Sequence, residues 1–275
     1  MSFSITGKTA IVTGAASGLG LAIARHFADK GANVMFADMD EDKLDAEIGD
    51  EAKGDGPIRS FAYNLCEKLA ISNLLSATFD AFDRADILVN AARRMALSDP
   101  LSAEADAVAD LFRENALSGL RLTQMTAKRM MHWAEKTGAE PGTPIGSIIN
   151  ISSVAVRVTQ PELLGYSVSC AAIEQMTRSL AVALAPKGIR VNAVAIGSVM
   201  SGSLQHALKD DTTARQKIVA HTPLGRIAAP DELAETVQYL ASDASGFMTG
   251  QVVTVDGGRG LLIRYASPRT DPYSG

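Results

Sequence analysis

The sequence has few cysteines and no long apolar run. Its 275 residues include only two cysteines, Cys66 and Cys170, which favours a reducing compartment over a disulfide framework. No apolar stretch approaches the roughly 20 residues that span a bilayer. Glycine and charged residues interrupt the first eight positions, where a signal peptide would carry a basic segment and a long apolar stretch. We therefore expect a cytoplasmic protein with no membrane partner.

An excess of positive charge is also missing. The 26 Lys and Arg residues are outnumbered by 31 Asp and Glu residues, which gives a net charge of −5. Because nucleic-acid-binding domains carry a clustered basic face, we expect no nucleic-acid partner. The four histidines show no spacing typical of metal ligands, so no structural or catalytic metal is expected either.

What the sequence does contain is a regular alternation of apolar runs and amphipathic stretches. The apolar runs are typical of short buried strands and cover residues 9–13, 33–37, 58–62, 87–90, 147–151, 190–195 and 252–255. The amphipathic stretches predict helices over residues 19–30, 68–82, 103–136, 165–184 and 231–242. This alternation predicts an α/β protein with a doubly wound Rossmann fold, in which helices cover both faces of a parallel sheet.

No linker or shift in composition divides this pattern. An apolar fraction of 47% over 275 residues is enough for one large core, so we predict a single domain over residues 1–258. The tail that follows, 259–275, is expected to be either loosely ordered or docked on a partner subunit. Residues 136–146 are rich in Gly, Pro and Thr and predict a surface loop. Residues 198–224 follow a strand and are expected to form a substrate loop, since ligands of such folds bind beyond the carboxyl ends of the strands.

A glycine-rich loop follows the first predicted strand. Gly14, Gly18 and Gly20 have the spacing T-G-x-x-x-G-x-G and precede a predicted helix. Glycine permits a tight turn and the close approach of a pyrophosphate to the backbone. The start of the helix offers free N–H groups and a positive dipole end to phosphate. An ordinary strand-to-helix turn is the alternative to this dinucleotide site.

Asp38 ends the second predicted strand, eighteen residues after Gly20. A carboxylate at this place can accept both hydroxyls of the adenosine ribose and would repel a 2′-phosphate, so it favours NAD(H) over NADP(H). The alternative role is that of an N-cap for a helix beginning near Asp40.

Together these motifs and several others resemble the short-chain dehydrogenase/reductase family over about residues 3–258. The others are the strand 86–90 (DILVN), Asn115, Ser153 placed thirteen residues before Tyr166, and the closing segment 250–258 (GQVVTVDGG). The resemblance implies hydride transfer between a nicotinamide cofactor, NAD(H), and a small-molecule alcohol or carbonyl substrate. It further implies that Tyr166 is the acid and base, that Ser153 binds the substrate oxygen, and that Asn115 supports a proton relay.

The resemblance also assigns the cofactor-binding residues and an assembly. The residues implied to bind the cofactor are Gly14, Ser17, Gly18, Leu19, Gly20, Asp38, Asn64, Leu65, Asn90, Ala91, Gly197 and Val199. The implied assembly is a homotetramer in which helices 103–136 and 165–184 pack across a two-fold axis.

The chain departs from the family pattern around the reacting end of the cofactor. Cys170 stands where the family has a lysine, which binds the nicotinamide ribose and lowers the pKa of the tyrosine by about 1–3 units. Cys170 is interpreted as a plain small core residue, or as a nucleophile if a base lies near it. Ile196 replaces a proline, and Ser201 stands near a familiar threonine.

Arg93 is a further departure, because it replaces a glycine that lets the cofactor lie close to the backbone. It could crowd the pocket, supply the missing positive charge, recognise a carboxylate, or swing into solvent together with Arg94. These alternatives separate an NAD(H)-dependent oxidoreductase from a catalytically impaired dinucleotide-binding protein that acts as a subunit or sensor. An interaction scaffold without cofactor would leave the intact phosphate loop unexplained.

Overall fold

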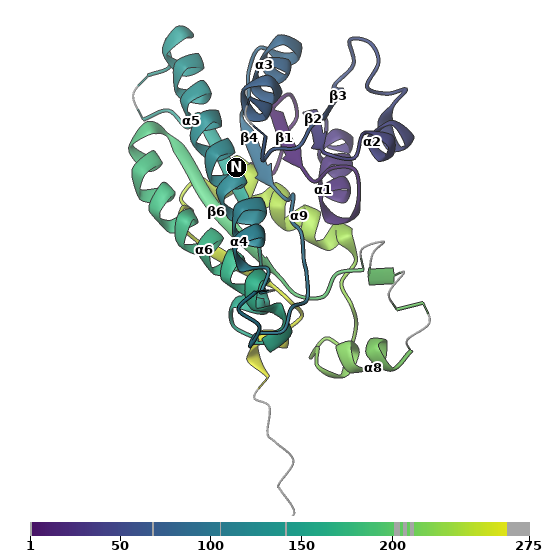
Figure 1. The fold of residues 1–275 in the computed structure, drawn as a ribbon. Helices are drawn as coiled ribbons and strands as arrows, with labels where there is room; N and C mark the ends of the chain where they lie inside the picture. The colour runs from purple at the N-terminus through teal and green to yellow at the C-terminus, as the bar shows by residue number, and fades with distance from the viewer. Residues whose placement is uncertain are drawn as a thin grey trace, which may run out of the picture.

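The computed structural model describes residues 2–67, 69–104, 106–140, 142–200, 204–205, 208–209 and 212–262. Its centre is a parallel sheet of seven strands in the order β3-β2-β1-β4-β5-β6-β7 (Figure 1). The strands are β1 (Thr9–Thr13), β2 (Asn33–Asp38), β3 (Ile58–Ala62), β4 (Ile87–Asn90), β5 (Gly146–Ser153), β6 (Ile189–Ile196) and β7 (Val252–Val255). The predicted doubly wound Rossmann fold is confirmed.

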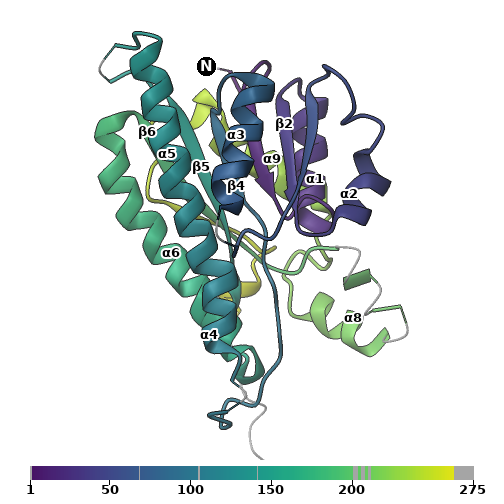
Figure 2. The same ribbon diagram turned by 45° about the horizontal axis from the view of Figure 1, so that its top comes forward.

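Helices cover both faces of this sheet (Figure 2). One face packs against α1 (Gly18–Asp29), α2 (Glu41–Ile48) and α9 (Pro230–Ala241), and the other against α3 (Ala70–Phe82), α5 (Ser118–Lys136) and α6 (Leu164–Leu184). Successive strand residues point to opposite faces, so Ala10 and Val12 of β1 join the first layer while Ile11 joins the second. Burial on both faces explains why the strands read as unbroken apolar runs.

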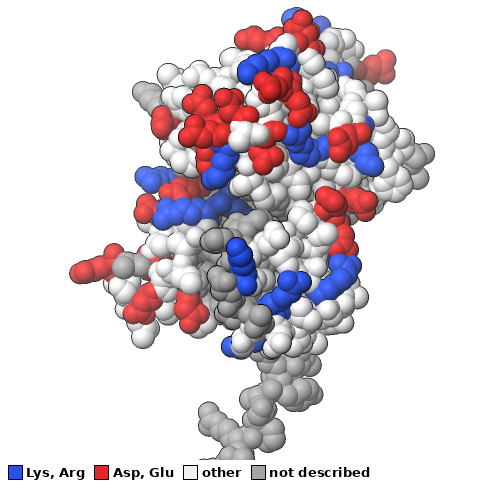
Figure 3. All heavy atoms as spheres, turned by 90° about the vertical axis from the view of Figure 1, so that its right-hand side faces the viewer, with Lys and Arg blue, Asp and Glu red and all other residues white. Residues whose placement is uncertain are grey.

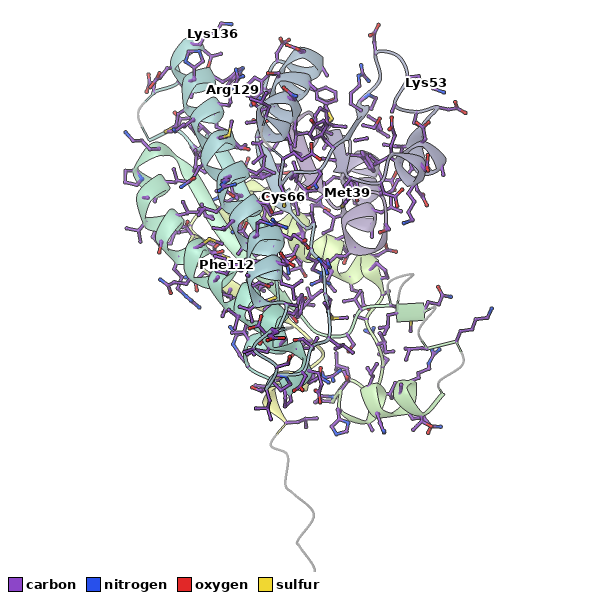
Figure 4. All side chains as sticks on the ribbon, viewed as in Figure 1. Met39, Lys53, Cys66, Phe112, Arg129 and Lys136 are labelled. Carbon is purple, nitrogen blue, oxygen red and sulfur yellow. The ribbon has the colours of Figure 1, made fainter. Side chains whose placement is uncertain are left out.

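The helix predicted over 103–136 begins later and is divided. It consists of α4 (Val108–Leu111), a π-helical turn (Phe112–Leu117) and α5, while residue 105 lies outside the described residues. Ala107 has a left-handed φ of 56°, which marks the start of the helix. Figure 4 labels Phe112 at the π-helical turn and Arg129 and Lys136 further along α5. Such turns recur at functional sites, and this one contains Asn115.

The predicted substrate loop is described only in part. It contains α8 (Thr212–Ala220), which stands apart from the sheet in Figures 1 and 2. Residues 201–203, 206–207 and 210–211, with Ser201 among them, lie outside the described residues, as do residues 263–275 of the tail. Residues 137–145 form the predicted loop and are largely exposed where they are described.

The described part of the chain holds no helix long and apolar enough to cross a membrane. Nor does it place three His, Cys, Asp or Glu side chains where they could hold a metal ion. Figure 3 shows acidic and basic side chains interspersed on the face that it displays.

The glycine loop after β1 lies directly against the segment after β4. These two strands are neighbours although α1, β2, α2, β3 and α3 separate them in sequence, so the chain changes direction across the sheet at this point. A Cβ added to Gly14 would lie 2.8 Å from the Cα of Ala92. Loops that diverge from such a switch point leave a crevice at the carboxyl ends of the strands.

We expect Gly14→Ala to destabilise the fold more than Gly7→Ala. The two glycines have similar left-handed φ angles, +70° and +74°, so each alanine should cost about 1–2 kcal/mol of unfolding free energy in backbone strain. Only the added Cβ at Gly14 meets backbone atoms, whereas nothing lies within 4 Å of the one at Gly7. Urea unfolding of both variants measures the difference, and equal losses would contradict the close approach.

Candidate active site

A cavity of about 720 Å³ opens at the carboxyl ends of the strands. The loops after β1, β2, β3, β4, β5 and β6 and the start of α6 contribute to its walls. This volume is within the usual range of small-molecule and cofactor sites. The cavity therefore joins, in one space, motifs that are spread over most of the chain.

One end of the cavity is made by the glycine-rich loop and the first turn of α1. Gly14, Ser17, Gly18, Leu19 and Gly20 all line it. Ser17 is the N-cap residue of α1, but its side chain makes no capping hydrogen bond within the described residues. The first N–H groups of α1 are thus available to an anion, and they carry the positive end of the helix dipole.

Asp38 lies beside this loop at the end of β2 and is half-buried. Its Oδ2 accepts a hydrogen bond from the N–H of Ala16 at 2.9 Å, and its Oδ1 accepts one from the N–H of Asp40 at 3.1 Å. The N-cap of α2 is Asp40, which accepts a hydrogen bond from the N–H of Lys43. Asp38 is therefore held at the cavity wall instead of capping the helix.

The residues expected around the rest of the cofactor divide into two groups. Asn64, Leu65, Ala91, Gly197 and Val199 line the cavity, as do Met39 and Cys66, which Figure 4 labels. The amide oxygen of Asn64 accepts a hydrogen bond from the N–H of Cys66 at 3.0 Å, which folds the loop after β3.

Asn90 differs from these residues, because it turns away from the main cavity. Its amide nitrogen donates to Thr123 Oγ1 at 2.9 Å and to Asn150 Oδ1 at 2.8 Å, beneath the layer of α5 and α6. It lines a separate space of about 20 Å³, large enough for one water molecule. Its position thus favours a role in the scaffold over direct contact with a cofactor in the main cavity.

The other end of the cavity holds Ser153 and Tyr166. Ser153 ends β5, Tyr166 lies in the first turn of α6, and both are buried. Burial raises the pKa of the Tyr166 hydroxyl, while Arg93 and a hydrogen bond with Ser153 lower it, and the net direction is upward. The phenol is thus held protonated at neutral pH, next to a hydroxyl that can share a substrate oxygen with it.

Asn115 reaches this end from the π-helical turn. Its side-chain oxygen accepts a hydrogen bond from the N–H of Arg94 at 2.8 Å, and its amide nitrogen donates to the Arg94 carbonyl at 2.9 Å and to Ser169 Oγ at 3.1 Å. The side chain therefore joins the segment after β4 to helix α6, on which Tyr166 lies.

Cys170 lies one helical turn after Tyr166 and is 2% exposed. It packs with Leu111, Leu163 and Tyr166 in a small apolar cluster. Burial raises the pKa of its thiol, so the uncharged form dominates at neutral pH. This environment favours a packing role over that of an activated nucleophile, which needs a lowered pKa.

The two arginines after β4 take different directions. Arg93 Nη1 donates a hydrogen bond to the Tyr166 hydroxyl at 3.1 Å. Arg94 instead forms a salt bridge with Glu114, with Nη1 at 3.0 Å from both carboxylate oxygens. Arg93 thus reaches the acid/base candidate, an arrangement that the sequence left open among several alternatives.

Some cavity residues were not found from the sequence. Arg259 lines the cavity and donates from Nη1 to Ser198 Oγ at 2.7 Å, and Gln160 lines it beside Ser153 and Tyr166. Arg259 directly follows Gly257-Gly258, and that position was the only available signal. Gln160 stands in a loop that carries no motif.

Comparisons with known proteins agree with this arrangement. Residues 14–259 match the family model described as enoyl-(acyl carrier protein) reductase. The chain is 33% identical to the 3-oxoacyl-(acyl-carrier-protein) reductase FabG of Thermotoga maritima, with coverage of 92% of this chain and 98% of the relative. It is 32% identical to the 7alpha-hydroxysteroid dehydrogenase of Clostridium sardiniense, with coverage of 94% and 95%.

A solved structure extends the likeness to three dimensions. A gluconate 5-dehydrogenase from Burkholderia cenocepacia J2315, in complex with NADP and tartrate, superposes with a TM-score of 0.82 at 29% identity and covers 95% of this chain and 98% of that one. The match of the family model over most of the chain, the reductase and dehydrogenase relatives and the shared fold lead to one conclusion: this protein belongs to the short-chain dehydrogenase/reductase family of oxidoreductases.

Proposed function

We propose that the protein is an NAD(H)-dependent oxidoreductase that interconverts an alcohol and a carbonyl compound by hydride transfer. The observation that carries this proposal is the single cavity with a phosphate-binding end and an acid/base end. At the first lie Gly14, Gly18 and Asp38, and at the second lie Ser153 and Tyr166. Both ends are required for the same reaction.

The first end fits a dinucleotide. The left-handed φ angles of Gly14 and Gly18, +70° and +57°, turn the backbone tightly without a Cβ in the way. The first turn of α1 offers N–H groups to a pyrophosphate. Asp38, oriented by the N–H groups of Ala16 and Asp40, keeps lone pairs for ribose hydroxyls. A bound nicotinamide dinucleotide would supply the site that gives or takes the hydride.

The second end handles the proton. In alcohol oxidation the phenolate of Tyr166 accepts the proton of the substrate hydroxyl, and in carbonyl reduction the phenol returns it. The Ser153 hydroxyl donates a hydrogen bond to the same substrate oxygen and stabilises the charge that develops there. Asn115 holds the loop after β4 in place against α6.

A second candidate function follows from Cys170, which is uncharged where relatives of this family carry a lysine. A protein that binds the dinucleotide but turns over no alcohol or ketone would be a binding subunit or sensor of the same fold. Calorimetric NAD titration, followed by assays on a panel of alcohols and ketones, separates the two functions. Binding with turnover supports the oxidoreductase, and binding without turnover favours the second candidate.

We predict that the protein binds NAD(H) more tightly than NADP(H). The Asp38 carboxylate would accept the ribose hydroxyls of the first cofactor and repel the 2′-phosphate of the second. Asp38→Ala removes both effects, so the ratio of the two dissociation constants should approach one. Isothermal titration calorimetry with each cofactor measures the ratio in both proteins. Equal affinities in the unchanged protein would refute the assignment to NAD(H).

Alcohol oxidation is predicted to be slow at neutral pH and to accelerate towards alkaline pH. The base is the phenolate of Tyr166, and because burial raises the pKa of this phenol, the phenolate fraction increases only as the pH rises towards that pKa. Reduction uses the protonated phenol, which is already the dominant form at neutral pH. Rates in both directions, measured with one substrate pair across the pH range, test this. Full oxidation rates at pH 7 would contradict it.

We further propose that the protein assembles as a homotetramer in which α5 and α6 pack across a two-fold axis. Helix α6 exposes apolar side chains that such packing would cover, among them Val168, 39% exposed, and Val182, 77% exposed. Light scattering at micromolar concentration should give the mass of a tetramer. Val182→Arg, on the exposed face of the helix, should shift it to smaller species, whereas a stable monomer of the unchanged protein would overturn the proposal.

A further inference from the structure

We propose that Arg93 supplies the positive charge on which Tyr166 depends as acid and base, taking the place of a cation on helix α6. This inference rests on the proposed oxidoreductase function, but it concerns a contact that exists in the protein without substrate. The contact is the hydrogen bond from Arg93 Nη1 to the Tyr166 hydroxyl, 3.1 Å long.

The surroundings of the phenol leave it short of positive charge. Tyr166 is 5% exposed, and the groups that act on the pKa of its hydroxyl are Arg93 from the segment after β4, Cys170 from α6 and Ser153 from β5. Arg93 and Ser153 lower that pKa, whereas burial and Cys170 raise it. Within the described residues, Arg93 is the one cation among these groups, and it can stabilise a phenolate that a buried site otherwise disfavours.

Two fixed partners hold the short segment that carries Arg93. On one side, Thr13 Oγ1 accepts hydrogen bonds from the N–H groups of Ala91 at 3.1 Å and Ala92 at 3.0 Å. On the other side, Asn115 binds both the N–H and the carbonyl of Arg94. The backbone is therefore fixed immediately before and after Arg93, which limits the freedom of its side chain and favours the contact with Tyr166.

Arg93 also differs from the other arginines of the cavity wall. Arg94 is paired with Glu114, Arg113 lies 3.5 Å from Asp110, and Arg259 donates to Ser198. No carboxylate of the described residues pairs with Arg93, so its charge is not neutralised by one of them. A guanidinium has five donors and stays protonated throughout the working pH range, so it can bind the phenol and keep donors for a ribose or substrate oxygen.

A spectroscopic test needs neither cofactor nor substrate. Tyr166 is replaced by 3,5-difluorotyrosine, whose more acidic phenol ionises before the other tyrosines and while the protein is still folded, and its absorbance is titrated. Arg93→Met should raise the pKa of this phenol by about 1–3 units, and Arg93→Lys by less, because it keeps the charge. Arg94→Met is the matched control, since it removes a neighbouring arginine already paired with Glu114, and it should leave that pKa unchanged.

A kinetic test then uses the natural tyrosine. Arg93→Met should slow alcohol oxidation at pH 7 by about 10- to 1000-fold and move the alkaline limb of its pH profile upwards by about 1–3 units, with a smaller effect on carbonyl reduction. Adding Cys170→Lys to this variant places an ammonium one helical turn from Tyr166 and should move the limb back down. Circular dichroism shows that the variants are folded.

The outcomes separate this inference from the proposed function. A pKa of the phenol that Arg93→Met leaves unchanged overturns the inference, even if the enzyme is active. An unchanged pKa together with a raised KM for carboxylate-bearing substrates would assign Arg93 to substrate binding instead. A shifted pKa in a protein that turns over no alcohol or ketone supports the charge supplied by Arg93 and refutes the oxidoreductase function.

Discussion

The junction between β1 and β4 is the contact on which the rest of the site depends. Thr13 ends β1, and its hydroxyl accepts the N–H groups of Ala91 and Ala92, while Gly14 is pressed against Ala92 so closely that no Cβ would fit. The phosphate-binding turn and the segment that carries Arg93 are thereby held against each other. Since strands β1 and β4 are neighbours only because the sheet changes its winding direction there, the fold itself creates this contact.

From this junction the site extends in two directions that meet different physical demands. Towards β2, open N–H groups and the oriented carboxylate of Asp38 suit a ligand with phosphates and ribose hydroxyls. Towards α6, the structure buries a phenol, and burial alone opposes its ionisation. A buried acid and base needs a compensating charge, and the arginine that meets this demand comes from the same segment that the junction fixes.

Chemical function at this site therefore does not require a cation at a fixed sequence position. Cys170 is short, buried and uncharged, and it leaves the neighbourhood of the phenol to a side chain from another element. Arg93 enters from the end of β4, some seventy residues earlier in the chain, and reaches the same hydroxyl. A loss on a helix and a gain on a loop become comparable once both are measured at the atom on which they act.

The sequence by itself determined the strand order of events along the chain, the parallel sheet, the glycine loop and the spacing of Ser153 and Tyr166, because these follow from local periodicity and from motifs with fixed geometry. It did not determine the break before Val108 and the π-helical turn within the predicted helix 103–136, since both depend on local dihedral angles and on the hydrogen bonds of Asn115. Nor did it decide between the roles of Arg93, or separate Arg93 from Arg94. Only tertiary packing brings one guanidinium to Tyr166 and the other to Glu114, because the direction of a long side chain is set by the partners that the fold places within its reach.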